Sequence, residues 1–175
     1  MNASELDELQ VEQARHDELA HREILDLPVE RHLTHMALHF AKYTGRLIGM
    51  QDSNRQVLER IIVDTTIICL CSANALHLSL GQFGTASKIL SPPFSPVALP
   101  MWLGSQMAVH NAGFAKACEA FDHREDFQYQ EVLSAGVIGI LRASLAAAEA
   151  MPIDLAAAIR SRWSGIEERF RRRAA

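Results

Sequence analysis

Residues 55–80 decide the fold class of this chain, and they read RQVLERIIVDTTIICLCSANALHLSL. The β-branched run at residues 61–68 is, taken alone, typical of a strand. The apolar pattern nevertheless continues to Leu80, beyond the usual length of a strand, and this favours one long helix. Because a helix this apolar is buried on most of its faces, we expect the rest of the protein to pack around it.

The sequence on either side also reads as helices. Pro28 and Pro152 mark helix boundaries, and four prolines between residues 92 and 100 indicate a linker. The sequence therefore predicts an all-α bundle of five to six helices in a single domain, residues 1–175. Its expected parts are a first helix at about 4–22, a first hairpin at about 29–80, a Pro-rich linker at 81–100, a second hairpin at about 101–151 and a closing helix at 153–171.

The two predicted hairpins show weak internal similarity. Met36-Ala37-Leu38-His39 matches Met107-Ala108-Val109-His110 at an offset of 71. An offset of 74 instead aligns Phe40-Ala41-Lys42 with Phe114-Ala115-Lys116. Two stacked hairpins from an internal duplication are one interpretation, and chance matches in an Ala- and Leu-rich chain are the other.

Composition narrows the functional classes. The 175 residues carry a net charge of −4, and residues 65–118 contain no Asp or Glu, whereas metal-dependent hydrolysis usually needs clustered acids. An odd number of cysteines, three, with no framework spacing predicts reduced thiols. Residues 1–30 are acidic and have no continuous apolar stretch, so we expect no export signal and a cytoplasmic protein. A basic segment limited to residues 169–173 argues against nucleic acid, and Asp64 within residues 61–80 argues against a membrane span.

His35 and His39 are the first candidate site. They are four residues apart and project from one helix face, a spacing that can hold a transition metal. Asp64, the one carboxylate in an apolar stretch, is the expected third metal ligand. The alternative is a histidine pair at the edge of the core that binds only backbone or water.

Asp64 needs a partner, because an unpaired buried carboxylate costs several kcal/mol. The candidate partners in the preceding helix are Lys42, Arg46, His35 and His39. Two roles for Asp64 remain as alternatives, namely a structural ion pair and a part in a functional site. Together with Asp64 and His39, the cations Lys42 and Arg46 are our candidate ligand-binding residues, and no catalytic residue is assigned.

The layout resembles the MazG-like, all-α nucleotide pyrophosphohydrolases. The resemblance rests on the helix order, on the apolar helix with Asp64, and on residues 151–163, MPIDLAAAIRSRW. In that family the second helix carries E-E-x-x-E and the third carries E-x-x-D, and these acids bind the magnesium that holds a nucleoside triphosphate. The resemblance implies a helical-bundle fold, a nucleotide ligand and a homodimer.

At the positions of this chain that match the two family motifs, most of the acids are missing. The first motif falls on residues 35–39, HMALH, and the second on residues 61–64, IIVD, so only Asp64 remains. Magnesium prefers hard oxygen ligands, whereas imidazoles suit zinc, nickel, iron or copper. We therefore expect a protein that has lost magnesium-dependent hydrolysis and binds a nucleotide, another small ligand or a partner. The alternatives are an active pyrophosphohydrolase that uses Asp64 with recruited acids (Glu30, Glu59, Glu131), and a bundle that binds a transition metal through His35, His39 and Asp64.

Overall fold

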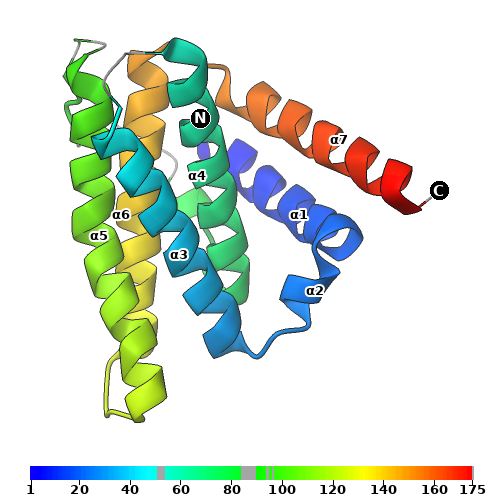
Figure 1. Cartoon of the computed structure of the whole chain (residues 1–175), viewed down its shortest axis with the longest axis vertical. Helices are drawn as coiled ribbons and strands as arrows, with labels where there is room; N and C mark the ends of the chain where they lie inside the picture. Colours follow the sequence, from blue (N-terminus) through cyan, green and yellow to red (C-terminus); the bar gives the residue numbers. More distant parts are fainter. Residues whose placement is uncertain (51–53, 84–89, 94, 96, 175) are drawn as a thin grey trace.

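The computed structural model describes residues 1–50, 54–83, 90–93, 95 and 97–174 of the chain. It is all-α, with no strand among these residues (Figure 1). The elements are α1 (Ala3–Ala20), α2 (Arg22–Leu25), α3 (Val29–Ile48), α4 (Arg55–Ala75), the 3-10 helix η1 (Gly81–Phe83), α5 (Ala98–His123), α6 (Tyr129–Ala150) and α7 (Leu155–Ala174).

Helices α3 to α6 form a four-helix bundle, and α1 and α7 lie together against the α4 side of it (Figure 1). The most extensive packing joins α3 to α5 and α5 to α6. Helix α4 contacts α1, α3, α6 and α7, so it has neighbours around most of its circumference. This placement confirms the helix predicted from residues 55–80 and explains why its sequence is apolar on nearly every face.

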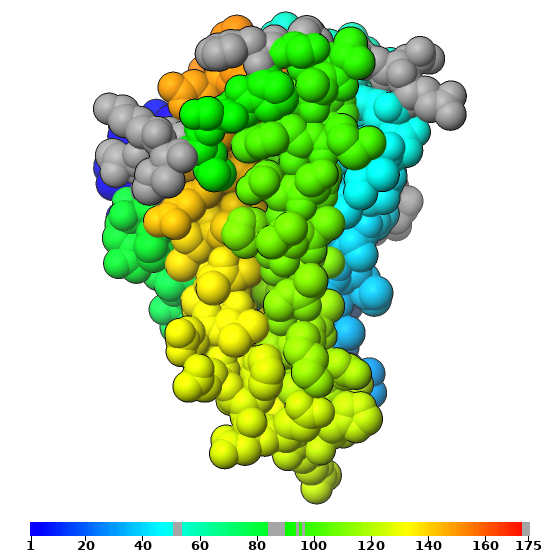
Figure 2. All heavy atoms as spheres, turned by 90° about the vertical axis from the view of Figure 1, so that its left-hand side faces the viewer, coloured from blue at the N-terminus to red at the C-terminus, as the bar shows by residue number. Residues whose placement is uncertain are grey.

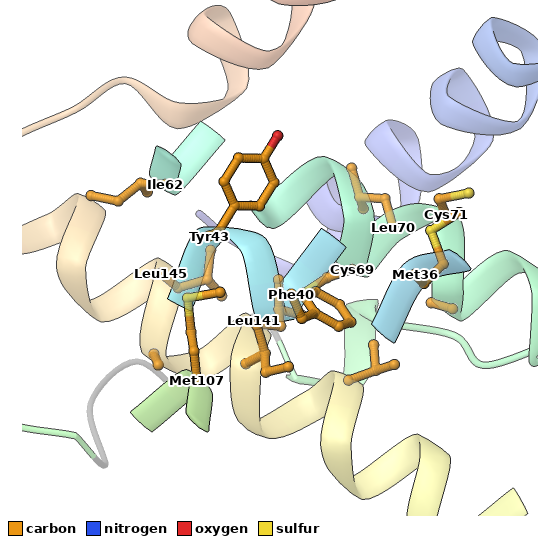
Figure 3. Close-up of a cluster of buried hydrophobic side chains, with 14 of the residues drawn as sticks. Met36, Phe40, Tyr43, Ile62, Cys69, Leu70, Cys71, Met107, Leu141 and Leu145 are labelled. Atoms are coloured by element: carbon orange, nitrogen blue, oxygen red, sulfur yellow. The ribbon is translucent and has the colours of Figure 1, made fainter. Parts of the chain in front are cut away.

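The core includes the crossing of α3 and α5. Phe40 and Phe114 meet there edge to face with ring centroids 5.8 Å apart, and both are fully buried. These two residues are equivalent at the offset of 74, so the crossing joins matching positions of the two hairpins. Figure 3 shows Phe40 beside Leu141 and Met107, whereas the Tyr43 hydroxyl points out of this apolar cluster.

Several predicted helix ends are wrong. Helix α4 ends at Ala75 rather than Leu80, because the chain turns at His77, which has a φ of 52°. Helix α1 begins at Ala3 and ends at Ala20, rather than spanning about 4–22, and it is capped by Asn2, whose side chain accepts from the Glu5 N–H at 2.9 Å.

The start of α5 lies before the end of the predicted linker at 81–100. Helix α5 begins at Ala98, so Pro100 lies in its first turn, where a missing N–H costs no helical hydrogen bond. Residues 81–83 form η1, whereas residues 84–89, 94 and 96 of the predicted linker lie outside the described residues. The short helix α2 was not predicted.

One helix in the described part of the chain, α6, is long and apolar enough to cross a membrane by length and composition, and 67% of its most apolar window is buried inside the protein. The sequence had drawn attention to residues 61–80 instead. In this fold α6 packs against α4 and α5.

Candidate functional site

Asp64 lies where α3, α4 and α7 meet, and three side chains donate hydrogen bonds to it. Arg162 of α7 donates from Nε to Oδ1 at 2.8 Å, and Arg60 of α4 donates from Nε to both oxygens at 3.1 and 3.2 Å. The Tyr43 hydroxyl donates to Oδ2 at 3.1 Å. The partners predicted from the preceding helix, the side chains of Lys42, Arg46, His35 and His39, were therefore wrong. The ion pairs of the carboxylate are with arginines of α4 and α7, and the preceding helix α3 contributes the Tyr43 hydroxyl instead.

The Tyr43 phenol is fixed as a donor in this network. Burial, the negative charge of Asp64 and the hydrogen bond to it raise the pKa of Tyr43 to about 12. The phenol therefore keeps its proton at neutral pH. The side chain of Asp64 is only 12% exposed and that of Arg162 only 19%, so their ion pair is shielded from solvent.

A cleft of about 570 Å³ opens beside this network, between α3, α4, α7 and the corner of α1 and α2. Its polar lining includes Tyr43, Asp64, His39, Arg162 and Arg169, and the half-exposed ring of Phe170 adds an aromatic face. Glu23, also in the lining, is 68% exposed.

A second, shallower cleft of about 660 Å³ adjoins the first and shares Arg162 and Arg169 with it. Arg60 and Glu59 belong to its lining. Because Arg60 and Arg162 each reach Asp64 through Nε, their terminal NH₂ groups remain available to another acceptor. Asp64 thus holds two guanidinium groups in fixed positions at the boundary of the two clefts.

The structure brings the predicted histidine pair together. The Nε2 atoms of His35 and His39 lie 3.1 Å apart, and Lys42 Nζ lies 3.0 Å from His39 Nδ1. Burial, with smaller contributions from Lys42 and His35, lowers the pKa of His39 to about 4, and burial likewise lowers the pKa of His35. Both imidazoles are therefore neutral at pH 7.

Asp64 does not join this pair as a third metal ligand. Among the described residues, no group of three or more His, Cys, Asp or Glu side chains is placed to hold a metal ion. Both oxygens of Asp64 accept hydrogen bonds from its three partners. The other proposed metal ligands, His35 and His39, are imidazoles. This set does not fit magnesium, which takes oxygen ligands in octahedral geometry.

The other candidate residues separate in space. His39 and Asp64 line the cleft, whereas Lys42 and Arg46 line a different open depression of about 600 Å³ next to Gly45 and Gly49. Of the acids proposed for recruitment, Glu59 lines the second cleft, and Glu30 and Glu131 line neither.

The arginines of this site were not predicted from the sequence. Arg60 carried a signal, because it precedes Asp64 by four residues and so lies on the same helix face. Arg162 carried none of this kind, since it is 98 positions from Asp64 and reaches it only through the packing of α7 on α4.

Comparison of the chain with protein-family models, with curated proteins and with solved structures finds no match. The fold is an all-α helical bundle. The site is a cleft at one side of the bundle, lined by arginines and by the carboxylate of Asp64. The resemblance to the MazG-like family rests on the residue pattern alone.

Proposed function

We propose that this chain is a divergent MazG-like protein that binds a small anionic ligand of the nucleotide type in the cleft at Asp64, without magnesium-dependent hydrolysis. The proposal rests on one observation, the hydrogen bonding of Asp64. It is the one acid left of the four in the family pattern, and it accepts hydrogen bonds from Arg60, Arg162 and Tyr43.

The cleft offers the groups that a phosphate-bearing ligand needs. The terminal NH₂ groups of Arg162 can bind phosphate oxygens in a planar, two-pronged manner. Arg169 uses its Nε to donate to the Gly165 carbonyl at 3.1 Å, so its NH₂ groups also remain available. Phe170 supplies a face on which a base can stack, and about 570 Å³ is within the usual range for a small-molecule site.

Hydrolysis is the runner-up function. An active pyrophosphohydrolase would need Asp64 to leave its arginines and bind magnesium together with an acid such as Glu59. That exchange would uncouple two guanidinium groups from the carboxylate that positions them. The pairing in this fold favours binding over hydrolysis.

Titration calorimetry with a nucleoside triphosphate, without magnesium, tests the binding. We expect Arg162→Ala and Arg169→Ala each to weaken binding by about tenfold, the value of one charge-assisted hydrogen bond. Arg160→Ala is the matched control, because Arg160 lies on the same helix but pairs with Glu12 at 2.8 Å, away from the cleft. Equal affinities in all three variants would contradict the assignment of the site.

We also propose that the protein is a homodimer that pairs through the outer face of α5. No charged residue occurs in α5 before Lys116, and Val97, Met101 and Val109 are at least half exposed on or next to this helix. Figure 2 shows α5 uncovered along this side of the molecule. Exposed apolar surface of this kind is typical of a protein–protein interface.

Sedimentation equilibrium checks the dimer. We expect a mass twice the 19.4 kDa of the chain, and a shift toward the single-chain mass on Val109→Glu. Val11→Glu, which changes an exposed valine of α1 instead, should leave the mass unchanged. A single-chain mass for the unmodified protein at all concentrations would refute the dimer.

A further inference from the structure

Four of the eight histidines line one small cavity beside the cleft. The cavity has a volume of about 100 Å³ and lies between α1, the α1–α2 corner, α3 and α4. His16 comes from α1, His21 from the corner, and His35 and His39 from α3. The nucleotide proposal uses neither this cavity nor the contact between His35 and His39.

The distance between the His35 and His39 rings suits a metal chelate. Imidazole nitrogens bind d-block metals at about 2.0–2.1 Å, so two Nε2 atoms 3.1 Å apart would subtend an angle of about 100° at a shared ion. This angle lies between the tetrahedral value and that of neighbouring square-planar or octahedral positions. The spacing of the two Nε2 atoms therefore suits one shared ion.

His16 supplies a second, independent observation. Its side chain is only 3% exposed, and its Nε2 has no hydrogen-bond partner among the described residues. Its Nδ1 lies 3.0 Å from Glu167 Oε1, so in the neutral imidazole the proton is on Nδ1 and Nε2 carries a lone pair. A buried acceptor of this kind requires a donor, and the cavity that His16 lines has room for more than one water molecule.

We infer that this cavity binds a divalent d-block cation such as Cu²⁺, Ni²⁺ or Zn²⁺. The ion bonds to Nε2 of His35 and of His39, and water fills its remaining positions. One metal-bound water donates to Nε2 of His16, which satisfies the unpaired acceptor. Imidazole ligands favour these ions over magnesium.

Lys42 opposes this binding. An ammonium 3.0 Å from His39 Nδ1 requires that nitrogen to be an acceptor, which places the proton on Nε2, the atom that must bind the metal. When the ion binds, the proton of His39 moves to Nδ1 and the exposed Lys42 side chain turns away. A side chain that accepts from Nδ1–H should therefore strengthen the site.

Electron paramagnetic resonance during a titration with Cu²⁺ tests the inference on the full chain, untagged and stripped of metal, with no nucleotide present. We expect one high-affinity Cu²⁺ per chain with nitrogen hyperfine coupling, weakened at least about tenfold by His35→Ala or His39→Ala. His123→Ala, an exposed histidine at the end of α5, is the control and should change nothing.

Lys42→Gln should tighten Cu²⁺ binding by about tenfold, a gain that a poorly folded variant would not give. Absence of nitrogen coupling, or equal affinity in the wild type, His35→Ala and His39→Ala, would overturn the inference. Since the titration contains no nucleotide, its outcome is independent of the proposed ligand cleft.

Discussion

At the scale of single residues, Asp64 links three helices. It accepts from Tyr43 of α3, Arg60 of its own helix and Arg162 of α7, so only the Arg60 contact is local in sequence. The i, i+4 spacing predicted correctly that His35 and His39 would meet, because helix geometry alone brings them together. Arg162 could not be predicted as a partner of Asp64, because the tertiary packing of α7 brings it there, whereas Arg60 lies on the same helix face as Asp64.

Asp64→Asn should destabilise the fold. The substitution removes both ion pairs and leaves the shielded Arg162 without its counter-charge, so we expect a loss of about 2–3 kcal/mol in the free energy of unfolding, measured with urea. Glu12→Gln is the comparison, since it removes the more exposed Glu12–Arg160 pair and should cost less than about 1 kcal/mol. Equal losses in the two variants would show that Asp64 has no special structural role.

Acid should also destabilise the protein. Burial lowers the pKa of His32 and of His110 below the ordinary value of 6.5, with a further lowering of the pKa of His110 by Arg142. Since the unfolded chain binds protons at these histidines more readily than the folded one, stability falls as the pH drops below about 6.5.

Urea unfolding at pH 7.5 and pH 5 measures this effect. We expect a smaller loss between the two pH values in His110→Gln than in the wild type. His123→Gln, an exposed position, should keep the full loss. A loss that is the same in both variants would mean that the burial of His110 does not contribute.

At the scale of elements, the sequence predicted which stretches are helical more accurately than the residues at which each helix begins and ends. The observed range of α3, Val29–Ile48, agrees with the range predicted from its apolar period and from Pro28. Both signals lie in the sequence of the helix itself or directly before it. Helix α4 stops early although Leu76, Leu78 and Leu80 extend its apolar pattern. The turn that ends it is held by side chains far away in sequence, since Gln10 of α1 donates to the Leu78 carbonyl at 2.7 Å.

Two helical glycines should respond oppositely to alanine. A Cβ at Gly165 of α7 meets nothing within 4 Å, so Gly165→Ala should stabilise the protein by about 0.5–1 kcal/mol. A Cβ at Gly136 of α6 would lie 3.2 Å from the His110 carbonyl oxygen and the Phe114 side chain of α5. Because backbone cannot move aside easily, Gly136→Ala should cost about 1–3 kcal/mol. Thermal unfolding distinguishes them, and a gain at Gly136 would show that α5 and α6 pack less closely than described.

At the scale of the whole molecule, the bundle of α3 to α6 provides the core, and the layer of α1 and α7 creates the clefts (Figure 1). The sequence predicted the all-α class and the two hairpins from period and proline positions. It could not predict that α7 would bring Arg162 to Asp64 and Arg169 to the same cleft, and this packing surrounds a lone acid with arginines.

We propose that the cleft binds a nucleotide and leaves it intact. The most direct measurement incubates the untagged protein with a mixture of nucleoside and deoxynucleoside triphosphates and magnesium, then identifies by mass spectrometry the nucleotides bound and free. We predict intact triphosphate on the wild-type protein, less of it on Arg169→Ala, and no protein-dependent monophosphate or pyrophosphate. Protein-dependent release of pyrophosphate, or no nucleotide bound, would contradict the claim.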